Sequence, residues 1–495
     1  MIRLPDWLAR RAALHPERPA LIAPDGRWSF AELHVWASRI AAGLGAGGLR
    51  PGDRVAILAH NHPAYAAAIH AAPRCGAVLV PLNTRLAPAE LAWQLADSGA
   101  TLLLHDDAHA QVATGLGAIP CRSLTSVAAQ RPAASEPGAA ASLALDAPHT
   151  IIYTSGTTGR PKGALLTIGN HWWSATASAL NLGLHADDRW LAVLPLFHVG
   201  GLAIVLRGAI YGMPVVLHER FDPAAALAAI DHEGVTIASV VAVMLQRMLE
   251  LRGDRPLPPH FRCALLGGGP APRPLLETCA ARGVPVLQTY GMTETASQAA
   301  TLPPADALRK LGSAGQPLLP LELRIVTADR DAAPGEVGEI CVRGPMVTPG
   351  YHNNPVASAA ALVDGWFHTG DLGYLDAEGF LYVLERRSDL IISGGENIYP
   401  AEVEAVLLAH PAVSEVGVVG VPDARWGQVP VAAVVVAAGH APDGALAAEV
   451  LAFCRARLAA YKCPRSVHFC AALPRTASGK LRRAELRAQL ISSDE

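Results

Sequence analysis

Short apolar runs alternate with helical patterns between residues 54 and 105, and this alternation constrains the fold more than any other feature of the chain. The runs Arg54–Ala59, Ala77–Pro81 and Thr101–His105 have the length and composition of buried strands. The segments between them, Pro63–Arg74 and Ala87–Asp97, have helical spacing. Strand–helix alternation of this kind favours parallel sheets with helices on both faces, so the sequence predicts an α/β fold.

The pattern changes further along the chain. Residues 110–146 are rich in Ala, Pro and Ser, and we expect a variable surface stretch that closes a first lobe. Strand–helix alternation returns over residues 147–300. Residues 311–385 contain short β-type runs between Gly, Pro and Asp turns, which predicts a small β-rich subdomain.

A charged connection at Glu385–Asp389 precedes a tail with its own pattern. Pro400 stands where the first residue of a helix would, and strands are expected at Glu415–Val421 and Val429–Ala438. We therefore predict two domains, residues 1–387 and residues 388–495.

Composition excludes several classes of function. The net charge is −3 and no basic block stands out, so neither nucleic acid nor an anionic membrane is an expected partner. The eight cysteines form no CxxC pair, which argues against a zinc site or a disulfide framework. The longest uncharged runs are broken by Pro and Gly and fall short of the ~20 apolar residues that span a bilayer. A cytoplasmic protein without membrane insertion is expected.

The strongest local signal is the run Thr154–Gly163, which reads TSGTTGRPKG and follows an apolar strand. Glycines let backbone N–H groups turn together toward an anion, hydroxyls add donors, and Lys162 adds a positive charge. A triphosphate needs these groups. The run is not a P-loop, because Lys162 is followed by Gly163 and not by Ser or Thr.

Two further motifs carry groups that a nucleotide requires. Tyr290 offers a ring for a base, Thr293 a hydroxyl for a phosphate, and Glu294 a carboxylate for Mg²⁺. Alone, this run is equally compatible with an ordinary helix start. Asp371 could accept hydrogen bonds from both ribose hydroxyls, and Arg386 could donate to the same sugar.

Two more motifs lie in the tail, Ser393–Pro400 and Pro474–Lys480. Together the five motifs resemble those of the adenylate-forming superfamily of acyl-CoA synthetases, luciferases and adenylation domains, in the family's order over residues 150–480. The resemblance implies a large N-terminal domain of two parallel α/β lobes plus a β-rich subdomain. It also implies a small α+β C-terminal domain that moves about a hinge.

The resemblance also implies roles for individual residues. Those expected to bind ATP are Thr154, Ser155, Gly156, Thr157, Thr158, Gly159, Lys162, Gly268, Gly269, Pro270, Tyr290, Gly291, Thr293, Asp371, Arg386 and Lys480. The expected catalytic residues are Lys480, Thr293, Glu294 and His198, with Glu294 holding Mg²⁺. The hinge is expected at Ser388 and Asp389, although the family commonly has Asp or Lys at the first of these. The coenzyme A side is expected at Ser393, Gly394, Gly395 and Glu396.

The acid pocket is expected around residues 194–201, where Phe197 and His198 offer an aromatic wall and Gly200 and Gly201 leave room; an ordinary buried turn is the alternative. Segments 210–217, 265–272, 288–298 and 386–404 are similar to those of 2-succinylbenzoate–CoA ligases of menaquinone biosynthesis. That substrate carries a second carboxylate. Further expected pocket residues are Gly291, Ser297 and Gln298; candidates for the second carboxylate are Ser297, Gln298, His198 and, ranked last because it could simply face solvent, Arg207.

The resemblance therefore implies conversion of 2-succinylbenzoate, ATP and coenzyme A to 2-succinylbenzoyl-CoA, AMP and diphosphate through an acyl-adenylate. Three alternatives stay open. The chain could be a general aryl or medium-chain acyl-CoA synthetase, a stand-alone enzyme that loads a carrier protein, or an inactive member of the fold. Self-association is also open.

Overall fold

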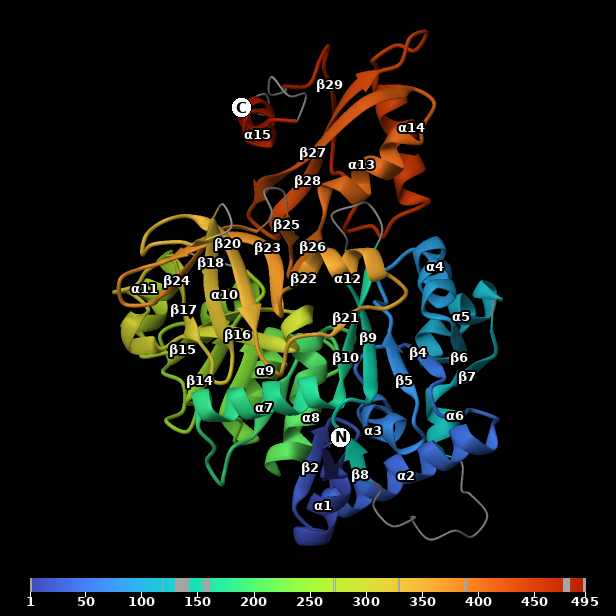
Figure 1. The fold of residues 1–495 in the computed structure, drawn as a ribbon, viewed down its shortest axis with the longest axis vertical. Coiled ribbons are helices and arrows are strands. Elements are labelled where there is room, and N and C mark those ends of the chain that lie inside the picture. The colour runs from blue at the N-terminus through green and yellow to red at the C-terminus, as the bar shows by residue number, and fades with distance from the viewer. Residues whose placement is uncertain are drawn as a thin grey trace.

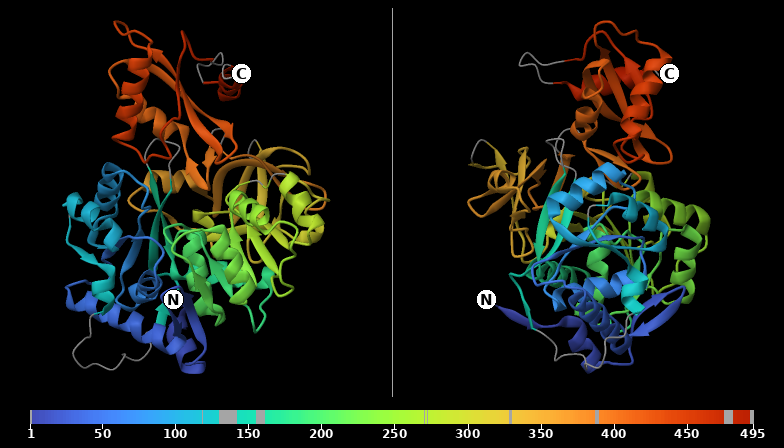
Figure 2. Two further views of the ribbon diagram at one scale, coloured as in Figure 1. Left: turned by 180° about the vertical axis from the view of Figure 1, so that it is seen from behind. Right: turned by 90° about the vertical axis from the view of Figure 1, so that its right-hand side faces the viewer.

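The computed structural model describes residues 2–117, 119–129, 142–154, 161–269, 271, 273–327, 330–386, 390–474 and 481–492. The side chains of residues 385, 386, 401 and 492 are not described. The chain forms two α/β lobes, a β-rich extension of the second lobe, and a C-terminal part at one end of the molecule (Figure 1 and Figure 2).

The first lobe is built on a seven-stranded sheet, and its core confirms the strands and helices expected over residues 54–105. The parallel strands are β9 (Pro148–Thr154), β5 (Val78–Pro81), β4 (Arg54–Leu58), β6 (Ala100–His105) and β7 (Cys121–Ser123) in that order. Antiparallel β10 (Lys162–Thr167) and β21 (Gly350–Tyr351) complete the edge. Helix α3 (Pro63–Ala71) starts at its predicted residue and ends three residues early, and α4 (Pro88–Ser98) lies within one residue of its predicted start and end.

The expectation of a plain surface stretch over residues 110–146 is wrong in its described part. Helix α5 (Ala110–Leu116) and strand β7 continue the alternation, and helix α6 (Leu124–Ala129) buries Leu124 and Val127. These elements have only three to seven residues, too few for a clear period in the sequence. Contact with α2 (Phe30–Ala46) stabilises α6.

The second lobe and the β-rich subdomain share one sheet. Its parallel part follows the order β2 (Pro19–Ala23), β12 (Val215–Leu217), β11 (Trp190–Ala192), β13 (Ile237–Val240), β14 (Cys263–Leu266) and β15 (Val286–Met292). Antiparallel β16 (Ser297–Leu302) and β17 (Ser313–Pro317) then lead into β24 (Leu381–Arg386), β23 (Trp366–Leu375), β20 (Gly338–Arg343) and β18 (Glu322–Thr327). Hydrogen bonding is therefore continuous from the lobe into the subdomain.

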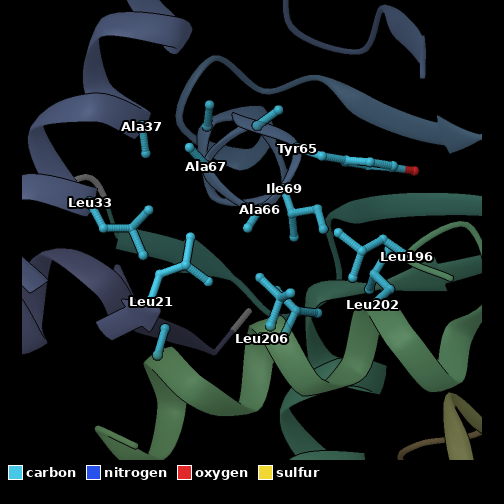
Figure 3. Packing of buried hydrophobic residues seen from close by; sticks show 14 of the residues in the cluster. Leu21, Leu33, Ala37, Tyr65, Ala66, Ala67, Ile69, Leu196, Leu202 and Leu206 are labelled. Carbon is cyan, nitrogen blue, oxygen red and sulfur yellow. The ribbon is translucent and has the colours of Figure 1, made fainter. Parts of the chain in front are cut away.

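The largest hydrophobic cluster joins the two lobes. Leu21 of β2, Ile69 of α3 and Leu206 of α8 (Val199–Tyr211) come from both lobes and meet in one buried layer (Figure 3). Each such side chain contributes roughly 1.5–3 kcal/mol when fully buried. This shared core fixes the relative position of the lobes and of the strand ends between them.

The C-terminal part has its own sheet and core. Its strands are β25 (Ile391–Ser393), β26 (Glu396–Ile398), β27 (Val413–Asp423), β28 (Gly427–Val436) and β29 (Val467–Phe469). Its helices are α13 (Pro400–Leu408), α14 (Gly444–Arg455) and α15 (Arg483–Ser492), and Pro400 is the first helical residue as expected. The predicted domain boundary falls between β24 and β25, where residues 387–389 are outside the described set, and stays a prediction.

None of the described helices combines the length and the hydropathy that crossing a membrane requires.

Candidate active site

A cavity of about 720 Å³ lies between the two lobes and the C-terminal part. Its lining residues follow the carboxyl ends of parallel strands: His60 follows β4, Asn83 follows β5, Val241 follows β13 and Gly267 follows β14. Ligands of open α/β folds bind at this edge of the sheet. The volume is that of a small-molecule site.

Glu294 lines the cavity. It lies in the turn η3 (Thr293–Thr295) between β15 and β16, it is buried, and Tyr351 donates a hydrogen bond to its Oε1 at 2.8 Å. Burial raises the pKa of Glu294 and the Asp371 carboxylate raises it further, against the opposing effects of Tyr351 and Lys162. A divalent cation would stabilise the ionised form, so this buried carboxylate fits the Mg²⁺ expected there.

Asp371 of β23 lies near Glu294, and Tyr290 donates a hydrogen bond to its Oδ2 at 2.7 Å. The strand register pairs Asp371 with Arg386 of β24, so the two residues expected at the ribose meet through the backbone. The Tyr290 ring belongs to the core of the β-rich subdomain and is not among the cavity-lining residues. Its hydroxyl reaches the expected ribose site through Asp371, whereas its ring is not presented for stacking on a base.

Two of the expected pocket glycines are required by close backbone approaches. A Cβ at Gly291 would lie 1.8 Å from the Ser297 carbonyl oxygen, and one at Gly201 would lie 2.2 Å from that of Pro195. Gly291 and Gly200 line the cavity, but Gly201 does not. Gly201 therefore lets α8 pack on the preceding loop and does not widen the pocket.

The aromatic wall expected from the sequence is present. Phe197 and His198 both line the cavity, with ring centroids 4.7 Å apart. Asn61 fixes the loop before them: its side-chain amide donates to the Leu194 carbonyl at 3.0 Å and its oxygen accepts from the Leu196 amide at 2.8 Å. The wall therefore rests on a loop held by the first lobe.

Arg207 faces the cavity and not the solvent, contrary to the reason given for ranking it last. Its residue is only 2% exposed, and its guanidinium carbon lies 5.4 Å from the centre of the Trp190 ring. Nη2 donates to Ser174 at 3.3 Å, and Nε has no hydrogen-bond partner in the part of the chain that the structure describes. Burial lowers the pKa of Arg207, and no carboxylate among the described residues forms an ion pair with it.

Other expected residues lie in the same cavity. Ser297 and Gln298 line it, and both polar side-chain atoms of the buried Gln298 lack hydrogen-bond partners within the described residues. Thr154, Thr293 and Gly268 also line it, whereas Gly269 packs next to Ile392.

The C-terminal part supplies another wall through Gly394, Gly395 and Glu396, while Ser393 is buried outside the lining. Glu396 Oε1 lies 3.0 Å from Nη1 of Arg85, and Oε2 lies 3.2 Å from Nε2 of His198. Burial acts to raise the pKa of Glu396, but His198 and Arg85 outweigh it and lower the pKa.

A second ionic contact across the same interface has no motif in the sequence. Lys462 Nζ lies 2.7 Å from Glu90 of α4 and 2.8 Å from Glu402 of α13, and all three groups are buried. The backbone amide of Ala459 also donates to Glu90 at 2.7 Å. Arg85, Glu90, Glu402 and Lys462 were missed by sequence reasoning, because these partners come from remote parts of the chain.

Several expected residues cannot be placed. Those outside the described residues are Ser155, Gly156, Thr157, Thr158, Gly159, Pro270, Ser388, Asp389 and Lys480. The backbone of Arg386 is described, but its side chain is not. Lys162 begins β10, and its ammonium lies 5.4 Å from the centre of the Tyr351 ring.

The fold has two lobes and a C-terminal part around one cavity, and the site has carboxylates suited to Mg²⁺ and to a ribose. These features indicate the class of nucleotide-dependent enzymes. Residues 8–352 match the model of the AMP-binding enzyme family, and residues 402–480 match that of the AMP-binding enzyme C-terminal domain. The chain belongs to the AMP-binding enzyme family.

Relatives in this family are similar over the whole chain. A 2-succinylbenzoate–CoA ligase of Geobacillus kaustophilus is 53% identical, with 100% of both chains covered. A double mutant of the o-succinylbenzoate CoA synthetase of Bacillus subtilis, bound with its product analogue OSB-NCoA, is 48% identical with a TM-score of 0.92. The alignment covers 98% of each chain.

The same Bacillus subtilis protein in complex with its acyl-adenylate intermediate gives a TM-score of only 0.76, at 47% identity over 98% of this chain and 99% of that one. Identity and coverage are nearly equal for the two complexes, so the difference in TM-score is a difference in backbone geometry. The backbone of the present structure is thus more similar to that of the product-analogue complex than to that of the acyl-adenylate complex.

Proposed function

We propose that this protein is an ATP-dependent acid–CoA ligase that converts 2-succinylbenzoate, ATP and coenzyme A to 2-succinylbenzoyl-CoA, AMP and diphosphate. The full-length similarity to 2-succinylbenzoate–CoA ligases supports the reaction. The observation that carries the choice of acid is Arg207, a buried cation on the cavity wall without a carboxylate partner among the described residues.

An acid with two carboxylates explains this arrangement. A guanidinium keeps its charge in proteins, and an unpaired buried charge is costly. The carboxylate of 2-succinylbenzoate that does not react would pair with Arg207, while the aromatic ring lies against Phe197 and His198. The unpaired amide of Gln298 offers further hydrogen bonds to the same acid.

The other carboxylate reacts with ATP. One of its oxygens attacks the α-phosphorus of ATP, the bond to diphosphate breaks, and an acyl-adenylate forms. Bound at Glu294, Mg²⁺ would supply positive charge next to the phosphates. Thr293 offers a hydroxyl to the α-phosphate, and Asp371 orients the ribose. We place the adenylation lysine at Lys480 by family resemblance.

Transfer to coenzyme A requires a different arrangement of the C-terminal part. The thiol sulfur attacks the acyl carbonyl, loses its proton and releases AMP. Gly394, Gly395 and Glu396 already face the cavity here, and the arrangement resembles that of the CoA-analogue complex. We therefore assign the described arrangement to thiol transfer, with domains at 1–387 and 388–495 moving about residues 388–389.

The small-molecule partners are the acid, ATP and coenzyme A. Because ATP and coenzyme A are metabolites of the cell interior, we further infer that the protein acts in the cytoplasm.

The first experiment measures diphosphate release from Mg-ATP with 2-succinylbenzoate, benzoate, coumarate, octanoate or acetate, with and without coenzyme A. Turnover with 2-succinylbenzoate should exceed turnover with each other acid. Preference for benzoate or octanoate would contradict the dicarboxylate assignment while keeping the ligase reaction. Absence of CoA-thioester formation, with adenylate formed, would contradict the ligase and favour loading of a carrier protein.

A further inference from the structure

Three side chains with metal-ligating atoms meet beside the cavity, at the carboxyl edge of the seven-stranded sheet. His60 follows β4, Asp106 follows β6, and His109 ends the short helix η2 (Asp107–His109). Strands β4 and β6 are parallel neighbours, so the residues just beyond them lie side by side. One ligand atom from each of the three side chains lies within 4.8 Å of the other two.

Asp106 lies between the two imidazoles. Its Oδ1 is 2.5 Å from Nδ1 of His109, and its Oδ2 is 3.3 Å from Nδ1 of His60. The backbone amides of the same two histidines also donate to it, at 3.0 and 2.8 Å. Asp106 therefore bridges the two histidines through both of its carboxylate oxygens.

We propose that His60, Asp106 and His109 form a binding site for one divalent d-block cation such as Zn²⁺, separate from the Mg²⁺ expected at Glu294. Imidazole suits Zn²⁺, Ni²⁺ and Co²⁺, whereas Mg²⁺ takes oxygen ligands. Within the described residues the ion pairs of the three side chains are with one another, so no lysine or arginine there competes for Asp106.

The geometry needs only a small closure to bind the metal. Tetrahedral ligands at bond lengths of about 2.0–2.1 Å lie about 3.4 Å apart. The ligand atoms lie within 4.8 Å of one another, and Asp106 lies 3.3 Å or less from each imidazole, so small side-chain rotations would bring them to this spacing. The side chain of His60 is 43% exposed and has room to rotate. Asp106 and His109 are held in place by η2, whose first turn Asp106 caps.

The proposed site touches the acid pocket through one residue. His60 lines the cavity, and its neighbour Asn61 holds the loop that carries Phe197 and His198. A bound cation would restrict His60 and hence this loop. We therefore expect metal binding to change the KM for the acid more than kcat.

The chain offers a matched control in a second cluster. His368 Nδ1 lies 2.9 Å from Glu339 Oε2 and 3.5 Å from the sulfur of Cys341. Burial raises the pKa of the Cys341 thiol to about 12, so the thiolate that a metal requires is disfavoured there. The cluster presents similar ligand types at comparable spacing but lies in the β-rich subdomain.

The test is calorimetric titration of the chelator-treated full chain with Zn²⁺, in the presence and absence of excess Mg²⁺. The wild type should bind one equivalent that Mg²⁺ does not displace. His60→Gln and His109→Gln should each weaken the affinity at least ~10-fold, whereas Cys341→Ser should leave it unchanged. Circular dichroism checks that each variant is folded.

Co²⁺ provides a second readout that does not depend on activity. Bound at the proposed site, it should give visible d–d absorption without a thiolate-to-cobalt charge-transfer band. Affinity unaffected by both histidine variants, affinity lost in Cys341→Ser, a thiolate band, or only weak binding without a defined stoichiometry would each overturn the proposal.

Discussion

Arg207 and Lys462 are cations buried to nearly the same extent, but they differ in whether carboxylates contact them. Lys462 contacts two carboxylates, Glu90 and Glu402, at 2.7 and 2.8 Å. Arg207 has a single hydrogen bond, from its Nη2 to Ser174, and no carboxylate partner among the described residues. A buried cation that pairs with carboxylates of the protein stabilises one arrangement of its parts. A buried cation on a cavity wall without a carboxylate partner can instead bind an anionic ligand.

Glu294 extends this comparison to the anions. It is a buried carboxylate whose raised pKa shows that its surroundings do not fully stabilise its charge. We expect Glu294→Gln to lower the rate of adenylation by roughly 10²–10³-fold, the loss typical of one charge-stabilising group. Single-turnover diphosphate release measures this effect.

The same variant should be more stable than the wild type without ligands. Because the folded-state pKa of Glu294 is raised, its ionisation costs folding free energy as the pH rises from 4.5 through that raised pKa. Denaturant unfolding at neutral pH should show the gain. A less stable variant with full adenylation activity would contradict the assignment of Glu294 as the Mg²⁺ residue.

Arg207→Met tests the unpaired cation directly. Loss of one partner of a buried charge pair costs about 2–5 kcal/mol, so kcat/KM for 2-succinylbenzoate should fall by about 100-fold. Any residual activity with benzoate, which lacks the second carboxylate, should change little and serves as the internal control. Steady-state kinetics with both acids give the ratio.

The free energy of unfolding of Arg207→Met distinguishes a role of Arg207 in binding the acid from a structural role. Removal of a buried charge that has no partner should leave the free energy of unfolding unchanged or raise it. Equal losses with 2-succinylbenzoate and benzoate, or strong destabilisation, would show that Arg207 has a structural role.

Lys462→Met tests the paired cation. It leaves Glu90 and Glu402 buried without their partner, which disfavours the described arrangement. The proposed movement of the C-terminal part would expose these carboxylates to water and so limit the cost. We therefore expect thioester formation to slow by about 10-fold, equivalent to about 1.4 kcal/mol, while adenylation stays near the wild-type rate. Parallel single-turnover assays of the two half-reactions measure the difference.

The contrast also shows what sequence could and could not predict. Glu294, Asp371, Phe197 and His198 lie in short motifs whose residue types match the chemistry, and all four line the cavity. Arg207 was predicted as a candidate for the second carboxylate, but the direction of its side chain was not predicted. In a helix as apolar as α8, the sequence does not reveal which face borders a cavity.

Lys462 could not be found from the sequence at all. Its partner Glu90 is 372 residues away, and the contact exists only because two separately folded parts meet. The same limit explains the missed Arg85–Glu396 pair, since no local period or motif encodes a contact between parts. The strands of the two lobes were predictable because their apolar runs are local properties of the chain.

Glu396→Gln is expected to have a small effect on stability, and this effect depends on pH. The lowered pKa of Glu396 means that its ionised form stabilises the described arrangement fully above pH 4.5, and that this contribution is lost as the pH falls through the lowered pKa. The wild type should therefore lose stability on acidification below pH 4.5 more steeply than the variant. Urea unfolding of both proteins between pH 3 and 6 measures the two slopes.

The sign of this effect separates Glu396 from Glu402 within one interface. Burial raises the pKa of Glu402 despite its contact with Lys462, so Glu402→Gln should remove a cost of ionisation that grows as the pH rises above 4.5. Glu396→Gln should reduce stability at pH 6, and Glu402→Gln should reduce it less or not at all. If the stability of both variants depended on pH in the same way, the opposite directions of the Glu396 and Glu402 pKa shifts would be contradicted.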